Sequence, residues 1–242
     1  MNAVSRTDIG SRKENQDRVK VAILNDNTAF AVVCDGMGGE NAGGLASELA
    51  INMVYDRVTS GYREDFDSNN IKNLLTSAVG AANVVVYNAA RDDESREGMG
   101  TTCVAAIVRD GVVHMVNVGD SRGYVFEHGC LNQVTTDHTV VRFLYEQGEI
   151  GEEEMRNHPL RNKITKAVGV VQSVDIDYFE ISVSEGGALL LCSDGLSNYC
   201  TNEVIAEYIG NYDADECADR LISHVIEQKG NDNITLALIK DL

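Results

Sequence analysis

Short runs rich in β-branched, small and aromatic residues limit the folds open to this chain more than any other feature of its sequence. Their length and composition predict strands. Helical patterns separate these runs in blocks rather than following each strand, which is not the order of a doubly wound parallel sheet. The sequence therefore predicts an α+β fold. The predicted strands cover residues 19–24, 29–34, 103–108, 112–118, 123–126, 178–183, 188–192 and 234–239.

Two apolar stripes at helical spacing predict helices over residues 71–89 and 217–226. The second helix carries terminal signals as well. Asp213 is a candidate N-cap, and Gly230 follows the C-terminal end, where a left-handed residue is favoured. Further helices are expected over residues 44–60 and 201–208, and a helical insertion is expected within the block of later strands.

The charge balance excludes one class of partner. The chain has 20 Lys and Arg against 38 Asp and Glu, a net charge of −18. Because nucleic-acid affinity depends on clustered basic charge, DNA and RNA are not expected partners. We find no repeat, no Pro- or Ser-rich linker and no low-complexity tract, so residues 1–242 are expected to form a single domain.

The cysteines and the hydropathy pattern indicate the compartment. Six cysteines are scattered without a Cys-x-x-Cys pair, and several lie in apolar runs, which is typical of buried reduced thiols. No signal-type apolar region follows Met1, and no window approaches the roughly 18 consecutive apolar residues of a membrane helix. We expect a cytoplasmic protein without membrane attachment.

Asp-Gly pairs occur at Asp35-Gly36, Asp110-Gly111 and Asp194-Gly195, each after a predicted strand. The ordinary structure for such a pair is a type I′ hairpin turn. This interpretation fits Asp110-Gly111, because alternating apolar residues resume at once. It does not fit the first pair, which leads into far more glycine than a turn needs, or the last, which leads towards a helix. Those two pairs are expected in functional loops.

Several aspartates end or adjoin predicted strands. A single such residue more often serves as a turn or helix cap. Sets made of carboxylates alone suit Mg²⁺ and Mn²⁺, whereas zinc recruits His or Cys. The glycine-rich loop lacks the signature of a Walker A or a dinucleotide site, which makes nucleotide binding a poor hypothesis. The aspartates in question are Asp17, Asp35, Asp120, Asp194 and Asp232.

Short motifs in one fixed order over more than 200 residues carry a resemblance to a known family. With them, the chain resembles the metal-dependent protein phosphatases of type 2C in their compact bacterial form. The motifs are SRKENQDR (11–18), VCDGMGG (33–39), GTT (100–102), VGDSR (118–122), TDHT (136–139), HPLRN (158–162), LCSDGL (191–196) and GNDNIT (230–235).

This resemblance implies a four-layer αββα sandwich, with two antiparallel sheets flanked by helices and the metals at one edge. It implies two Mg²⁺ or Mn²⁺ ions. Asp35 would bridge them, the Gly36 carbonyl would bind one, and Asp194 and Asp232 would complete the other. Asp17 would act mainly through metal-bound water.

The same resemblance implies that Asp120, together with Asp194, holds a third, weaker ion. Arg12 would bind the substrate phosphate, which its planar fork of donors suits better than a lysine would. Arg12, Asp35 and Asp194 are thus the implied catalytic residues. The implied reaction is hydrolysis of phosphoserine and phosphothreonine in proteins by a water activated between two metals.

Residues 139–168 resemble the flap beside the cleft in bacterial members, which we associate with substrate choice. His138 and His158 are expected to be hydrogen-bonding groups rather than metal ligands, because neither has a ligand-like spacing. The implied partners are phosphorylated proteins and a cognate serine/threonine kinase, and a monomer is expected.

The chain departs from the family at Glu40. Relatives commonly carry a histidine there, proposed as a general acid. An ordinary carboxylic acid is ionised at pH 7, so Glu40 is expected to be a poor replacement. Two other functions stay open at this point: a binuclear hydrolase of small phosphoesters, and an inactive relative that binds phosphoproteins. The presence together of Arg12, Asp17, Asp35, Asp194 and Asp232 argues against the inactive form.

Overall fold

The computed structural model describes the backbone of the whole chain and every side chain except those of residues 39–41 and 156. Its strands are β1 (Asn2–Asp8), β2 (Asp17–Asn25), β3 (Thr28–Met37), β4 (Gly100–Thr101), β5 (Cys103–Arg109), β6 (Val112–Val118), β7 (Arg122–Glu127), β8 (Cys130–Gln133), β9 (Asp177–Ser182), β10 (Ala188–Cys192) and β11 (Ile234–Lys240). Its helices are α1 (Gly39–Gly61), α2 (Ser68–Arg91), α3 (Val140–Glu146), α4 (Glu152–Asn157), α5 (Asp194–Ser197), α6 (Asn202–Asn211) and α7 (Ala214–Glu227), with a short 3₁₀ helix at Glu94–Arg96.

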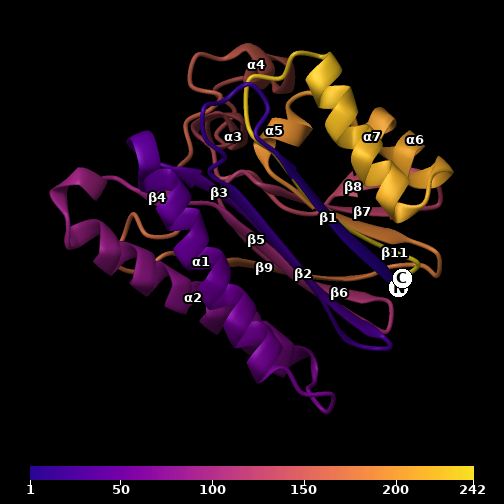
Figure 1. Cartoon of the computed structure of the whole chain (residues 1–242). Coiled ribbons are helices and arrows are strands. Elements are labelled where there is room, and N and C mark those ends of the chain that lie inside the picture. Colours follow the sequence, from indigo (N-terminus) through magenta and orange to yellow (C-terminus); the bar gives the residue numbers. More distant parts are fainter.

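Two antiparallel sheets form the centre of the molecule. One has the strand order β1-β11-β10-β7-β8, and the other has the order β2-β3-β5-β6-β9, with β4 paired to β3. Helices α1 and α2 cover the outer face of the second sheet, while α6 and α7 cover the first (Figure 1). The predicted α+β fold and four-layer αββα sandwich are confirmed.

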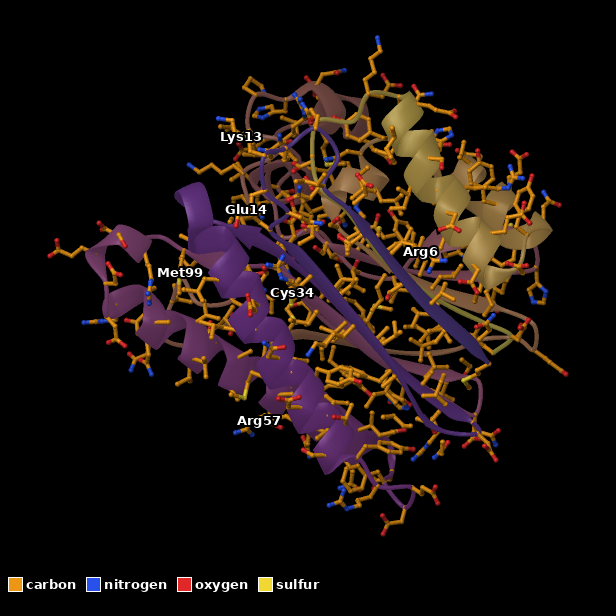
Figure 2. All side chains as sticks on the ribbon, viewed as in Figure 1. Arg6, Lys13, Glu14, Cys34, Arg57 and Met99 are labelled. Carbon is orange, nitrogen blue, oxygen red and sulfur yellow. The ribbon has the colours of Figure 1, made fainter. Side chains whose placement is uncertain are left out.

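Strand β3 shows why the sequence takes this form. Phe30, Val32 and Cys34 pack towards α1 and α2. The alternate residues Ala31 and Val33 pack into the layer between the two sheets. Successive side chains of a strand point to opposite faces, so a strand covered on both faces must be apolar throughout. Side chains fill the space between all four layers (Figure 2).

Local signals of the sequence are largely confirmed. The hairpin between β5 and β6 turns at Asp110 and Gly111, whose φ values of 50° and 74° fit a type I′ turn. Asp213 caps α7, because its carboxylate accepts a hydrogen bond from the Glu216 amide at 2.8 Å.

The prediction for the end of α7 was wrong by one residue. The left-handed residue is Lys229, with φ 57°. Gly230 follows it, and its amide donates to the Val225 carbonyl at 3.0 Å, as in a Schellman motif. A Cβ on Gly230 would lie 2.6 Å from Val225 Cγ1, so glycine is needed there for close packing rather than for its φ angle.

Strands β1, β4 and β8 were not predicted. β1 and β8 lie at the edges of their sheet, and each has only one buried residue, Val4 or Leu131, among exposed and half-buried ones, so their apolar content is low. β4 is only two residues long. The predicted helical insertion is present as α3 and α4. Among the described helices, none combines the length and apolar content needed to cross a bilayer.

Candidate metal centre

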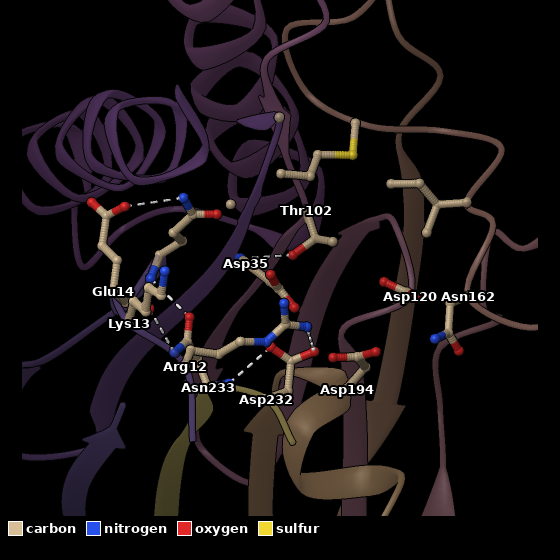
Figure 3. A pocket seen from close by; sticks show the side chains of 15 residues that line it. Arg12, Lys13, Glu14, Asp35, Thr102, Asp120, Asn162, Asp194, Asp232 and Asn233 are labelled. Atoms are coloured by element: carbon tan, nitrogen blue, oxygen red, sulfur yellow. Dashed lines mark hydrogen bonds and ion pairs between the residues drawn. The ribbon is translucent and has the colours of Figure 1, made fainter. Parts of the chain in front are cut away.

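A pocket of about 690 Å³ opens at the edge of the sandwich where β3, β10 and β11 meet their loops. Four of the five predicted aspartates line it. In Figure 3 the carboxylates of Asp194 and Asp232 lie close to the Arg12 guanidinium. The lining residues are Arg12, Lys13, Glu14, Gln16, Asp35, Gly36, Met37, Gly38, Thr102, Asp120, Asn162, Ile164, Asp194, Asp232 and Asn233.

Asp17 is the predicted aspartate that does not line the pocket. It pairs with Asp35 across β2 and β3 and is almost fully buried. Its Oδ2 accepts a hydrogen bond of 2.7 Å from the Ser193 hydroxyl, which itself accepts from the Thr235 amide at 3.2 Å. Ser193, which directly follows β10, therefore holds Asp17 in place.

Two threonines fix the backbone of Asp35. The Asp35 amide donates to Thr102 Oγ1 at 2.9 Å. The Asp35 carbonyl accepts from the Thr102 amide and from Thr101 Oγ1, both at 2.8 Å. Since these bonds hold the residue on both sides, the Asp35 carboxylate projects into the pocket from a rigid base.

Gly36 explains the glycine density that follows Asp35. A Cβ on Gly36 would lie 2.1 Å from the Gly43 carbonyl oxygen, and one on Gly43 would lie 2.8 Å from the Gly36 carbonyl carbon. No side chain fits at either position. The first turns of α1 pack directly against the end of β3 that bears the aspartate.

Asn233 holds the loop that carries Arg12, a role that sequence reasoning missed. Its Nδ2 donates to the carbonyls of Ile9 and Glu14, both at 2.9 Å, and its Oδ1 accepts from the Gln16 amide at 2.9 Å. Asn233 is buried, so all its hydrogen-bonding groups need partners. Asn233 directly follows Asp232 in the sequence, and this position was the only sign there that it could belong to the site.

Arg12 and Asp232 form an ion pair of 2.7 Å at the rim of the pocket. The hydrogen bond to Asp232 raises the pKa of the Arg12 guanidinium, so its charge is secure. The Arg12 side chain is 54% exposed, and an exposed pair of this kind is worth only about 0–1 kcal/mol. A divalent cation or a phosphate can therefore displace it at little cost.

Without a cation, the carboxylates of the pocket repel one another. Burial, followed by the charges of Asp17 and Asp194, raises the pKa of Asp35 well above its usual range. Burial and the nearby Asp120 and Asp232 raise the pKa of Asp194 to about 7. Asp35 and Asp194 still keep part of their surface open to the pocket, where a cation could relieve the repulsion.

The same repulsion extends to the other two buried carboxylates. Burial, followed by the charge of Asp137, raises the pKa of Asp120 to about 6. Burial also raises the pKa of Asp17, against the hydrogen bond that Ser193 supplies.

This donor set fits Mg²⁺ or Mn²⁺. The described residues that line the pocket offer carboxylate oxygens rather than His or Cys side chains. Hard cations prefer such oxygen ligands. Within the described residues, no three acid, His or Cys side chains lie close enough together to hold an ion as they stand. Mg²⁺ keeps several of its waters and needs only one or two protein carboxylates, so a partly hydrated ion suits the open arrangement.

The loop after β6 places Asp120 through His138 and Asn117. The Gly119 amide donates to His138 Nδ1 at 3.0 Å, and Asn117 Nδ2 donates to the Gly119 carbonyl at 3.2 Å. His138 Nε2 lies 3.1 Å from Asp177 Oδ2. Burial lowers the pKa of His138, which keeps its ring neutral near pH 7. The prediction of a hydrogen-bonding histidine is confirmed.

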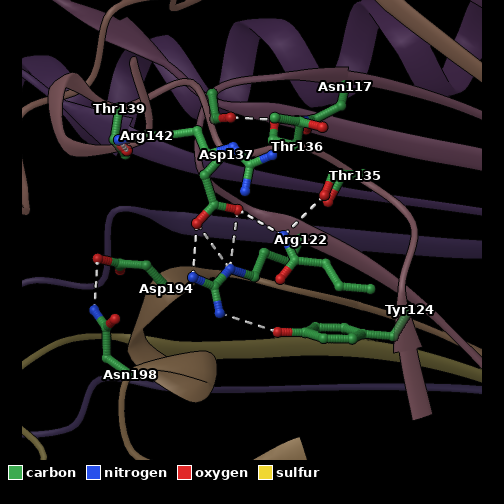
Figure 4. A network of polar contacts seen from close by, with 12 residues as sticks. Asn117, Arg122, Tyr124, Thr135, Thr136, Asp137, Thr139, Arg142, Asp194 and Asn198 are labelled. Carbon is green, nitrogen blue, oxygen red and sulfur yellow. Dashed lines mark hydrogen bonds and ion pairs between the residues drawn. The ribbon is translucent and has the colours of Figure 1, made fainter. Parts of the chain in front are cut away.

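An ion pair between Arg122 and Asp137, near Asp120, completes this side of the pocket. Figure 4 shows its two partners. The Arg122 guanidinium donates through Nε and Nη2 to Asp137, at 3.0 and 2.6 Å, and through Nη1 to the Tyr124 hydroxyl at 3.2 Å. Arg122 and Asp137 are mostly buried. Neither was singled out from the sequence as a site residue.

Two remaining sequence predictions concern Glu40 and His158. The Glu40 side chain lies outside the described residues. His158 Nδ1 accepts from the Leu160 amide at 3.1 Å in an exposed turn, as expected of a hydrogen-bonding group. The segment that contains it closes at its base through bridges of Thr139 with Ile164 and of Thr101 with Val168.

Known proteins are similar to this chain in sequence and in fold. Residues 6–234 match the family described as Protein phosphatase 2C. The chain is 36% identical to the serine/threonine phosphatase stp of Listeria monocytogenes over 99% of this chain and 96% of the relative.

Two solved structures extend the comparison. The serine/threonine phosphatase PstP/Ppp of Mycobacterium tuberculosis superposes with a TM-score of 0.87 and 32% identity, covering 98% of this chain and 97% of that one. The catalytic domain of PstP in complex with two manganese ions gives a TM-score of 0.83 and 30% identity, covering 98% and 96%. The carboxylate pocket and these similarities agree: the chain belongs to the protein phosphatase 2C family, the metal-dependent serine/threonine phosphatases.

Proposed function

We propose that this protein removes phosphate from phosphoserine and phosphothreonine side chains of other proteins, using two Mg²⁺ or Mn²⁺ ions held in the carboxylate pocket. The observation that carries this proposal is the convergence of Asp35, Asp194 and Asp232 beside Arg12. When bound, the ions supply an activated water and neutralise charge on the phosphoryl group.

The ligand roles that the family resemblance implies agree with where the residues lie. Asp35 would hold both ions, with the Gly36 carbonyl as a further ligand of one, and both residues line the pocket. Asp194 and Asp232, which also line it, would hold the other ion. Asp17, buried beside Asp35, would act through water rather than directly.

Arg12 binds the phosphoryl oxygens of the substrate. Its guanidinium lies at the rim, and its backbone loop is fixed by Asn233. A planar guanidinium donates two parallel hydrogen bonds to a phosphate, which orients the phosphoryl group as well as attracting it. Asp120, together with Asp194, would hold a third and weaker ion.

We place the whole chain in one domain, with residues 139–168 acting in substrate choice. Asn162 and Ile164 from this segment reach the pocket wall, which supports that role. Phosphorylated proteins are the substrates, and a cognate serine/threonine kinase is the implied partner. We also propose that the protein is a monomer.

The thiols support a cytoplasmic location. All six cysteines are free, and five are buried. Cys130 is exposed, which differs from the expected burial of every thiol, and an exposed free thiol persists best in a reducing compartment.

The decisive experiment measures hydrolysis of p-nitrophenyl phosphate and of a phosphothreonine peptide with Mg²⁺, with Mn²⁺ and with excess chelator. We expect turnover of both substrates with either ion and none with chelator, because carboxylate and water ligands hold these ions only moderately. Undiminished turnover in chelator would contradict the two-metal proposal.

The same assay separates the two other functions. Turnover of small phosphoesters without peptide turnover would favour a small-molecule phosphatase. Binding of the phosphopeptide without any turnover would favour an inactive regulatory protein.

A further inference from the structure

Exposed apolar side chains lie on segments that border the metal pocket. Val170 and Val171, in the loop after β-bridge residue Val168, are 45% and 48% exposed. Single exposed aliphatic residues are normal on a protein surface, but adjacent ones beside a functional pocket indicate a binding surface.

An apolar surface connects these valines to the pocket. Met37 lines the pocket. A Cβ built on Gly100 would lie 2.8 Å from Val170 Cγ2 and 3.0 Å from Met37 Cε, so the two side chains converge over this glycine. We call Met37, Val170 and Val171 the apolar shelf.

The loop that bears the shelf is fixed from below by Asn83 of α2. The Asn83 Oδ1 accepts from the Gly169 amide at 2.7 Å, and its Nδ2 donates to the carbonyls of Val171 and Gln172 at 3.0 and 3.2 Å. Asn83 is 2% exposed. A buried amide with every bond directed at one loop holds that loop rigid, so little conformational entropy is lost when the shelf binds a ligand.

The loop is also held at a fixed place relative to Asp35. Thr101 and Val168 exchange two backbone hydrogen bonds of 3.1 and 2.8 Å. The Thr101 hydroxyl donates to the Asp35 carbonyl at 2.8 Å. One residue thus ties the shelf and the centre of the metal pocket together.

We infer that the apolar shelf binds an aliphatic side chain of the phosphoprotein substrate, within a few residues of the phosphorylated one. This inference rests on the proposed function. The shelf lies on the Met37 side of the pocket, whereas Arg12, Lys13 and Glu14 make another part of its lining charged. Met37 lines the pocket and also meets Val170 over Gly100, so a peptide whose phosphate occupies the pocket can reach the shelf.

The test compares the parent with the double variant Val170→Thr/Val171→Thr, which keeps side-chain shape and replaces methyl groups with hydroxyls. The substrates are phosphothreonine peptides of Ser and Ala in which one valine is placed at each of the three positions on either side. The same peptide without valine and p-nitrophenyl phosphate complete the set.

A matched control is Ile23→Thr. Ile23 is 55% exposed on β2, close to the Asn25–Thr28 end of the β2–β3 hairpin and away from the Asp17–Asp35 end.

We expect the parent to prefer valine at one or two positions. The double variant should lose about five- to tenfold in kcat/KM on those peptides, mainly through KM. Its kinetics on the valine-free peptide and on p-nitrophenyl phosphate should match those of the parent, as should every reaction of Ile23→Thr.

Equal rates of the parent on all the peptides, or an equal loss by the double variant on peptides with and without valine, would overturn the inference and leave the proposed function standing. A parent that hydrolyses p-nitrophenyl phosphate but no peptide would overturn the proposed function, and the inference with it.

Discussion

Asp35 and Asp194 are the residues at which charge and function are most closely linked. We expect Asp35→Asn and Asp194→Asn each to lower turnover at least about a hundredfold, or roughly 2.7 kcal/mol in barrier, because each removes the charge of a proposed metal ligand. The raised pKa values of both carboxyls mean that their ionised forms are destabilised in the metal-free fold. Thermal unfolding without metal should therefore show an equal or higher Tm in both variants, and a variant that unfolds would contradict this explanation.

We expect substitution of Glu40 to change turnover only slightly. An ionised carboxylate cannot donate a proton to the leaving group, so Glu40→Ala should keep turnover of p-nitrophenyl phosphate and of a phosphothreonine peptide within about tenfold of the parent. The peptide reaction is the informative one, because a serine or threonine leaving group needs a proton far more than a nitrophenolate does. A hundredfold loss on the peptide alone would identify Glu40 as the proton donor.

Among the elements, β7 and the loop after β8 are joined by the Arg122–Asp137 pair, which lies behind Asp120. Asp137→Asn removes a negative charge next to the proposed site of the weaker ion and leaves the mostly buried Arg122 guanidinium without its counter-ion. We expect the metal concentration for half-maximal rate to rise several-fold and the free energy of unfolding to fall by about 3 kcal/mol.

Asp120→Ala is the matched variant for that experiment. It should raise the metal requirement and lower turnover without a comparable loss of stability, and the two inner ions should remain. An Asp137→Asn protein with the parent's metal requirement would show that the pair serves only to stabilise the fold.

How far the sequence predicts an element depends on where that element lies. Buried β3 was predicted because apolar residues are needed on both its faces, and α7 was predicted from its stripe and its Asp213 cap. Edge strand β1 was missed because it pairs only with β11 and is half exposed, so few of its residues need to be apolar.

The candidate site divides in a similar way. Its aspartates were predicted from residue type and order along the chain. The Arg12–Asp232 pair and the Asn233 bonds to the Arg12 loop were not, because they join residues more than 200 positions apart. Local patterns carry no information on such contacts.

For the molecule as a whole, the pocket links metal binding, pH and stability. In the metal-free fold the pKa of Asp194 is raised to about 7 from its ordinary value near 4. For a carboxyl whose folded pKa is raised, the charged form is penalised, and the penalty is full above pH 7 and fades as the pH falls towards 4. A bound cation removes this penalty and needs the ionised carboxylate, so Mg²⁺ should bind more tightly at pH 8 than at pH 5.5.

Thermal unfolding at the two pH values with and without Mg²⁺ measures this linkage. A cation at ten times its Kd adds about 1.4 kcal/mol to the free energy of unfolding, which for a chain of this size is a rise of roughly 3–6 °C in Tm. We expect a rise of that order at pH 8 and a clearly smaller one at pH 5.5. Asp35→Asn/Asp194→Asn is the control and should show almost no rise at either pH. A rise in the parent that is as large at pH 5.5 as at pH 8 would mean that the cation binds outside the carboxylate pocket.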